Sequence, residues 1–252
     1  MAEFTGADDL QGATFTDSDL TGARFVGADL SRAAMRGVQV EGMEIDAPWL
    51  FEGDGGLRVN GVDVRPYVDA ELNRRFPGRE VRAAGDPEGL RSAWAAVQHA
   101  WAATLDRVAA LPPGAVDVSV DGEWSFAQTL RHLVLATDMW LGRGIRELEQ
   151  PFHPLGVTDG SMDDEGFDMS VFTTGTPSYD EVLEARADRV SMVADLLGSA
   201  TADDLAASHP NPHDPAFPET TLSCLHVILE EEWEHHRYAV RDLDAIEARS
   251  DA

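Results

Sequence analysis

Residues 221–247, TLSCLHVILEEEWEHHRYAVRDLDAIE, decide the fold of this chain. Its large apolar residues recur at alternating intervals of three and four, which is the period of one face of an α-helix. The face consists of Leu222, Leu225, Leu229, Glu232, His236, Ala239 and Leu243. We therefore expect a helix whose apolar seam packs into a core, with Glu232 and His236 where a helical bundle normally has leucine.

These two polar residues need a compensating partner, because an unpaired carboxylate or imidazole in a core costs several kcal/mol. Two interpretations are open. The residues form a buried ion pair, or they bind a divalent metal together, since a spacing of four places both on one helix face. The polar residues beside them are interpreted as a solvated face: Glu230, Glu231, Glu234 and His235.

A third metal ligand is expected from a second helix, over residues 126–148. Ser125 and Gln128 have the spacing of a capping box that opens this helix, and His132 lies inside it. Met139 lies on the same face, where its flexible side chain leaves space for a cavity. His132, Glu232 and His236 are thus the predicted metal ligands, with a fourth position open for water or substrate.

Two further helices complete a predicted four-helix bundle. Asp86 and Pro87 open the first, which continues to about residue 111. Ser178 and Glu181 open the third, over about residues 179–197. Long loops precede the third and fourth helices, and loops of such length tend to be functional or disordered.

Other residues are expected to line or support the site. Met139, Trp140 and His153 are the expected substrate-binding residues, although ordering of the loop is the favoured role of His153. Arg237 is expected to orient the ligands. The remaining candidates are His209 and His213 at the cavity mouth, Asp138 on a solvated face, and Cys224 in the packed core.

The first fifty residues repeat with a period of five. Large apolar residues stand at each fifth position, namely Leu10, Phe15, Leu20, Phe25, Leu30, Met35, Val40 and Ile45. Helices and ordinary strands have other periods, whereas a coil with four equal sides has this one. Residues 6–47 resemble the pentapeptide-repeat family, which implies a right-handed quadrilateral β-helix of about two coils. So short a segment is expected to be a structural cap or a dimerisation face, which makes a homodimer one expected state.

Composition excludes several classes of function. The 46 acidic and 19 basic residues give a formal charge of -27, which disfavours direct binding to nucleic acid or to anionic membranes. The single cysteine, Cys224, excludes an internal disulfide framework and a cysteine-based zinc cluster. Without a signal segment or a long apolar run, we expect a cytoplasmic protein.

The bundle motifs resemble the DinB/YfiT-like superfamily of metal-binding four-helix bundles. The resemblance lies in GEWS (122–125), TLRHL (129–133) with Trp140, HV (226–227) and EWEHHR (232–237). It implies one histidine ligand from the second helix and a His-x-x-x-His pair from the last, followed by arginine. His132 and His236 match that pattern, whereas Glu232 stands at the first histidine of the pair. This departure resembles the mycothiol-dependent maleylpyruvate isomerase branch, in which zinc is held by two histidines and one glutamate.

The expected fold class is therefore α+β multidomain. A β-helix over 1–50 precedes a connector over 51–83, with a hairpin and a short helix, and an all-α DinB-like bundle over 84–252. The resemblance implies a divalent metal, zinc or alternatively nickel or another ion, and a thiol such as mycothiol. We expect a metal-dependent thiol S-transferase or isomerase acting on a small electrophile. The alternative is a non-catalytic scaffold whose metal stabilises the bundle and whose acidic repeat binds a partner.

Overall fold

The computed structural model describes residues 3–6, 10–51, 53, 55–158 and 161–250. The chain divides into two compact units, Met1–Asp46 (the N-terminal unit) and Ala47–Ala252 (the C-terminal unit). Residues 51–83, expected as a connector, belong to the C-terminal unit. Each unit is described by itself below.

The N-terminal unit is a succession of turns with a period of five. Backbone φ is positive, between 50° and 75°, at every fifth residue: Gly12, Asp17, Gly22, Gly27, Arg32, Gly37 and Gly42. At alternate turns the carbonyl of the large apolar residue accepts a hydrogen bond from the amide three residues later, as from Ala13 to Leu10 at 3.0 Å. Glycine predominates at the positive-φ position because it adopts this conformation without steric cost. The repeat seen in the sequence is therefore a repeat of backbone turns.

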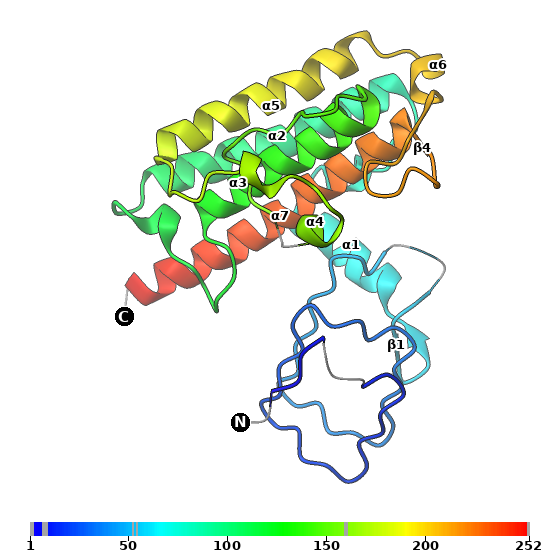
Figure 1. Cartoon of the computed structure of the whole chain (residues 1–252). Coiled ribbons are helices and arrows are strands. Elements are labelled where there is room, and N and C mark those ends of the chain that lie inside the picture. The colour runs from blue at the N-terminus through cyan, green and yellow to red at the C-terminus, as the bar shows by residue number, and fades with distance from the viewer. Residues whose placement is uncertain (1–2, 7–9, 52, 54, 159–160, 251–252) are drawn as a thin grey trace. The chain divides into compact units, whose positions relative to one another are not determined.

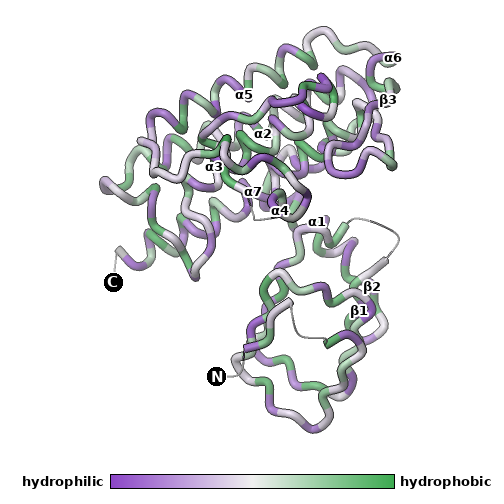
Figure 2. The backbone as a smooth tube through the Cα atoms, viewed as in Figure 1, coloured by the Kyte–Doolittle hydropathy of each residue, from purple (hydrophilic) through white to green (hydrophobic). Residues whose placement is uncertain are grey.

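The expected β-helix is not closed in this unit. No strand occurs among its described residues, all of which are exposed. The eight apolar residues at the five-residue spacing are 43% to 57% exposed, and hydrophobic segments recur along the trace of this unit (Figure 2). The physical reason is length, because in a stack of about two coils each coil has a single neighbour to cover it.

The C-terminal unit contains the expected hairpin, helices and bundle. Its two small antiparallel sheets pair β1 (Arg58–Val59) with β2 (Val62–Asp63) and β3 (Ser208–His209) with β4 (Glu219–Thr220). Its α-helices are α1 (Arg65–Arg75), α2 (Pro87–Ala109), α3 (Phe126–Thr137), α4 (Ser161–Asp164), α5 (Tyr179–Ser199), α6 (Ala202–Leu205) and α7 (Thr221–Ser250). The 3-10 helices are η1 (Arg79–Val81), η2 (Ala115–Asp117) and η4 (Met169–Val171), and η3 (Asp138–Ile145) is a π-helix that continues α3.

Four long helices, α2, α3, α5 and α7, form a bundle in which α2 and α3 each pack against both α5 and α7 (Figure 1). The core is built from the apolar faces of these helices, with Leu90, Val97, Leu130, Leu225 and Leu243 almost fully buried. Burial of such side chains stabilises the bundle by about 1.5–3 kcal/mol each. None of the described helices combines the length and the hydrophobicity required to span a bilayer.

The helix starts agree with the capping signals in the sequence. The Asp86 carboxylate accepts hydrogen bonds from the amides of Glu88 and Gly89 at the start of α2. Both halves of the capping boxes predicted at Ser125 and Ser178 are present at α3 and α5. The second predicted helix differs in one respect, because its last part, Asp138–Ile145, is π-helical.

Candidate metal centre

Helix α7 carries two Glu-x-x-x-His pairs that are offset by one residue. We call Glu231 and His235 the α3-facing pair, and Glu232 and His236 the core pair. One residue rotates the direction of a side chain by about 100° around a helix, so the two pairs point to different neighbours. The direction of each pair decides which of them can meet His132.

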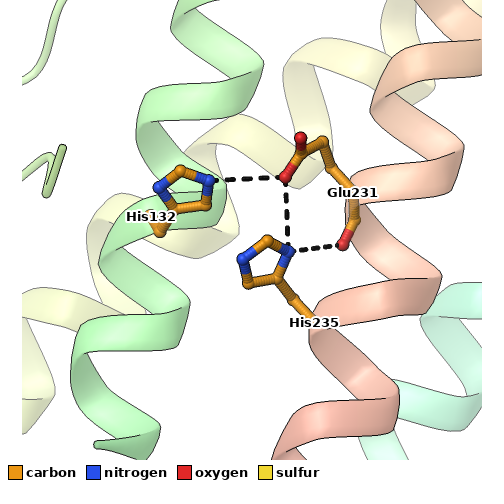
Figure 3. A group of neighbouring side chains, drawn as sticks. All are labelled: His132, Glu231 and His235. Atoms are coloured by element: carbon orange, nitrogen blue, oxygen red, sulfur yellow. Dashed lines mark hydrogen bonds and ion pairs between the residues drawn. The ribbon is translucent and has the colours of Figure 1, made fainter. Parts of the chain in front are cut away.

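The α3-facing pair meets His132 of α3 (Figure 3). His132 Nε2 lies 3.3 Å from Glu231 Oε2, and His235 Nδ1 lies 3.3 Å from the same oxygen. One potential ligand atom from each of the three residues lies within 4.8 Å of the others. The side chains are 13% to 28% exposed, so the cluster is half-buried and reachable from solvent.

A backbone carbonyl accepts a hydrogen bond from Nδ1–H of each ring. For His132 the acceptor is Val157, at 3.1 Å, and Nε2 on the other side of the ring faces Glu231. For His235 the acceptor is the carbonyl of Glu231, at 2.9 Å, and the same Nδ1 lies 3.3 Å from the Glu231 carboxylate. Such second partners are the usual way in which histidine ligands are oriented.

The electrostatics favour a neutral imidazole at His235. Burial, followed by the proximity of His132, lowers the pKa of His235 from 6.5 to about 4. A neutral ring keeps a lone pair for a metal at neutral pH. The lone pair of His132 and the carboxylate of Glu231 repel each other at 3.3 Å unless a proton or a cation lies near both. Two imidazoles and one carboxylate are a donor set that fits zinc and similar divalent ions.

Trp124 forms an aromatic wall beside the cluster. Its ring centroid lies 4.6 Å from that of His132 and 6.1 Å from that of His235, and the two imidazoles stack at 4.7 Å. A flat, half-buried wall restricts the directions in which the imidazoles can turn. The cluster is therefore held by packing as well as by hydrogen bonds.

The predicted ligand set of His132, Glu232 and His236 is not the set that the structure assembles. Both carboxylate oxygens of Glu232 accept hydrogen bonds from Arg186 Nη2, each at 2.5 Å. His236 Nε2 lies 2.9 Å from the hydroxyl of Thr104 on α2. Glu232 and His236 are buried in the seam as predicted, but their partners are an arginine and a threonine.

The α3-facing residues were expected on a solvated face and are instead half-buried against α3. Glu231 and His235 have the same spacing as the core pair and lie one position away from the seam, which is the signal in the sequence that identifies them. The signal for Arg186 was its place on the apolar stripe of α5, between the buried Val182 and Val193.

His153 and Asp138 order the long loop that follows η3. The carboxylate of Asp138 accepts hydrogen bonds from the His153 amide and from Arg189 of α5, and Asp138 is 1% exposed. The expectation that Asp138 is solvated was wrong, because Arg189 compensates its burial. His153 Nδ1 accepts a hydrogen bond from the Leu155 amide, so His153 has the predicted loop contacts, and its binding of a substrate stays a prediction.

The other predicted residues are placed as follows. Met139 is 3% exposed and packs with Leu135, Phe152 and Met162, whereas Trp140 is half-buried, with its ring 5.6 Å from that of His213. Arg237 pairs with Glu234 at 2.8 Å. Substrate binding by Met139 and Trp140, and orientation of the ligands by Arg237, stay predictions.

The histidines expected at the cavity mouth pair with loop carboxylates. His209 Nδ1 lies 3.1 Å from Glu147, and His213 Nδ1 lies 2.7 Å from Glu165. Cys224 is fully buried, and burial raises the pKa of its thiol to about 11, as expected for a packing residue.

Comparison with known protein families identifies both parts of the chain. Residues 9–42 match eight copies of the pentapeptide repeat. No curated protein and no solved structure matches the chain. Residues 96–239 match the DinB superfamily, and this region contains all three members of the histidine and glutamate cluster. Because that match covers more than half of its residues, the chain belongs to the DinB superfamily.

Proposed function

We propose that this protein binds a divalent metal, zinc in the first place, through His132, Glu231 and His235, and uses it as a thiol S-transferase or isomerase. The substrate is a small electrophile, and the thiol is of the mycothiol type. The proposal keeps the predicted chemistry and moves two of the predicted ligands by one position along α7.

A single observation carries the metal: Nε2 of His132 and Nδ1 of His235 each lie 3.3 Å from the same oxygen of Glu231, so potential ligand atoms from three residues converge. A backbone carbonyl accepts a hydrogen bond from Nδ1–H of each imidazole, which orients both rings within the cluster. Three protein ligands leave a coordination position open, which is typical of catalytic rather than structural zinc sites.

The metal, when bound, lowers the pKa of a thiol in its open position. His132, Glu231 and His235 would hold that ion, and the ring of Trp124, which packs beside both imidazoles, would exclude part of the solvent. The proposed substrate residues, Trp140 and His153, then position the electrophile for attack by sulfur. In a transferase, the sulfur–carbon bond forms as the bond from carbon to the leaving group breaks, and the proton of the thiol passes to solvent or to the leaving group. In an isomerase, the sulfur–carbon bond forms and breaks again, and the thiol regains its proton.

The test is metal analysis of the full-length protein, followed by turnover of mycothiol with monochlorobimane. We expect close to one zinc per chain and thiol conjugation in the wild type, with loss of both in His132→Ala. His99→Ala changes an exposed histidine of α2 and serves as the control that retains both. A wild-type protein that takes up no divalent ion after reconstitution would contradict the proposal.

A second candidate function is a non-catalytic interaction protein, which is favoured by the exposed apolar side chains of the N-terminal unit. Of the twenty large apolar residues exposed in the described chain, twelve lie in this unit, and exposed patches of this kind mark interaction sites. In this alternative, the repeat closes into the expected β-helix when a partner covers those side chains. Stoichiometric metal binding without turnover of any thiol and electrophile pair would favour this function over the transferase.

A further inference from the structure

The two pairs on α7 offer the bundle a choice between equivalent ligand sets. Glu231 with His235, and Glu232 with His236, have the same residue types and the same spacing of four. A rotation of α7 by about 100° would exchange the pair directed at α3 for the other. The apolar residues of α7 that lie in the core, such as Leu225, Leu229 and Leu243, oppose a rotation of the whole helix. Between Leu229 and Ala239, however, the seam consists of the core pair, so the polar contacts of this pair add to apolar packing in selecting which pair faces α3.

The core pair is held in place from two other helices. Arg186 of α5 is 5% exposed and Glu232 is 1% exposed, so their ion pair lies inside the bundle. On the opposite side, Thr104 of α2 bonds to His236 at 2.9 Å. The His236 ring also meets three aromatic rings edge-on, those of Phe76, Trp101 and Trp233.

A buried ion pair of this kind is better at specifying one arrangement than at adding stability. Desolvation of the two charges offsets most of their attraction, whereas removal of one partner leaves an uncompensated charge in the core. Any rotation that takes Glu232 away from Arg186 therefore leaves two charged groups buried without a partner. A single polar contact in a helical bundle fixes register in the same way.

We propose that Arg186 is a positioning residue: by holding Glu232 in the core, it fixes the rotation of α7 at which the α3-facing pair meets His132. Arg186 itself does not belong to the metal cluster. It acts through the helix, by removing Glu232 from competition with Glu231. This inference rests on the proposed metal centre and adds the device that selects its ligands.

The test is titration of metal-free, full-length protein with Co²⁺, followed by the visible absorption of the bound ion, at a temperature where each variant is folded. Arg186→Met should raise the Co²⁺ dissociation constant about tenfold or more and change the absorption band, as for other residues that orient metal ligands. The double variant Arg186→Met with Glu232→Met should return both readings to wild type, because the competing carboxylate is gone.

Arg107 of α2 offers a control that contacts neither the cluster nor the loop that holds His132. Its guanidinium bonds to Asp244 at 2.7 Å and to Glu247 at 2.8 Å, near the end of α7. Arg107→Met should lower the thermal midpoint and leave the Co²⁺ affinity within about twofold of wild type, because no ligand competition is released. Equal weakening by both variants would show a general loss of stability and would overturn the positioning role.

The remaining outcomes are also decisive. A folded Arg186→Met with wild-type affinity and an unchanged band overturns the inference, as does a double variant that binds as weakly as the single one. If Arg186→Met does not fold, Arg186→Gln takes its place: its amide keeps a hydrogen bond in the core, but it lacks the charge that holds Glu232, so the same weakening and band change are expected, and wild-type readings overturn the inference. A wild-type protein that binds no Co²⁺ instead contradicts the proposed metal centre itself.

Discussion

The adjacent residues Glu231 and Glu232 of α7 have different roles, because consecutive side chains of a helix point in directions about 100° apart and therefore contact different neighbours. Glu231 lies against His132 and His235, and Glu232 lies against Arg186. The same carboxylate is thus a candidate ligand in one position and half of an ion pair in the next. Substitution by glutamine, which keeps the shape and removes the charge, separates these roles.

We predict that Glu231→Gln reduces the zinc content strongly and leaves stability nearly unchanged, since the side chain is 28% exposed. Glu232→Gln should retain zinc, because the neutral amide does not compete for the ion. It should lower the free energy of unfolding by about 3 kcal/mol, because Arg186 loses its buried partner. Metal analysis and urea unfolding of the two variants provide the check, and an exchange of the two phenotypes would restore the ligand set predicted from the sequence.

His236 makes stability depend on pH in a defined direction. Burial lowers the pKa of His236 from 6.5 to about 4. Between these pH values, His236 binds a proton in the unfolded chain but not in the folded chain. The free energy of unfolding therefore falls as the pH falls from about 6.5 to about 4. At pH 5 the metal-free wild type should have lost roughly 2 kcal/mol relative to His236→Gln, compared with the same difference at pH 7. Urea unfolding at both pH values measures it, and parallel losses in the two proteins would contradict the assignment.

At the scale of the elements, the π-helix η3 is where the second helix departs from the expected α-helix, and it packs closely against the following loop. A Cβ at Gly142 would lie 2.6 Å from the Cβ of Pro151. A Cβ added at Gly198, near the end of α5, would have no atom within 4 Å apart from its own helix backbone and chain neighbours. Close packing therefore excludes a side chain at residue 142, whereas it leaves room for one at residue 198.

We predict that Gly142→Ala lowers the free energy of unfolding by about 1–3 kcal/mol, because the added methyl group overlaps the proline ring. Gly198→Ala should be neutral or stabilising by up to about 1 kcal/mol, since alanine is the better helix former. Thermal unfolding of both variants checks the difference. Equal thermal midpoints for the two variants would mean that the loop after η3 shifts to accommodate the methyl group at little cost in stability.

At the scale of the whole molecule, the candidate metal centre and the exposed apolar side chains lie in different units. All three residues of the cluster lie in the C-terminal unit, whereas the N-terminal unit exposes its row of apolar side chains. A site confined to one unit does not depend on the other for its ligands. An exposed apolar row, in contrast, is a surface for binding.

We predict that deletion of residues 1–46 leaves zinc stoichiometry and thiol turnover within about twofold of the full chain, because the deletion removes no ligand. It should also lower the fluorescence of a hydrophobic dye such as bis-ANS, whose binding sites are removed. Loss of zinc on deletion would show that the repeat supports the metal centre. Retained dye fluorescence would place the exposed apolar surface in the C-terminal unit.

The sequence by itself determined the elements. Caps at Asp86, Ser125 and Ser178 act within one turn, and the apolar stripes act along one helix, so both can be read locally. The same reasoning located the polar seam positions Glu232 and His236 and the single histidine of α3. The repeat of five followed from spacing alone, although so short a coil does not close into a β-helix.

The tertiary structure decided which polar residues meet. The seam shows that Glu232 and His236 are buried, and it leaves open whether a metal, an arginine or a threonine compensates them. Arg186 is 46 residues from Glu232 and Thr104 is 132 residues from His236 along the chain. The two candidate ligand sets lie one residue apart on α7. To tell which set meets His132, one must know how α7 is rotated relative to the three other helices. That rotation is set by the packing of the whole bundle and by the cost of stranding a buried charge, neither of which is a local property of the sequence.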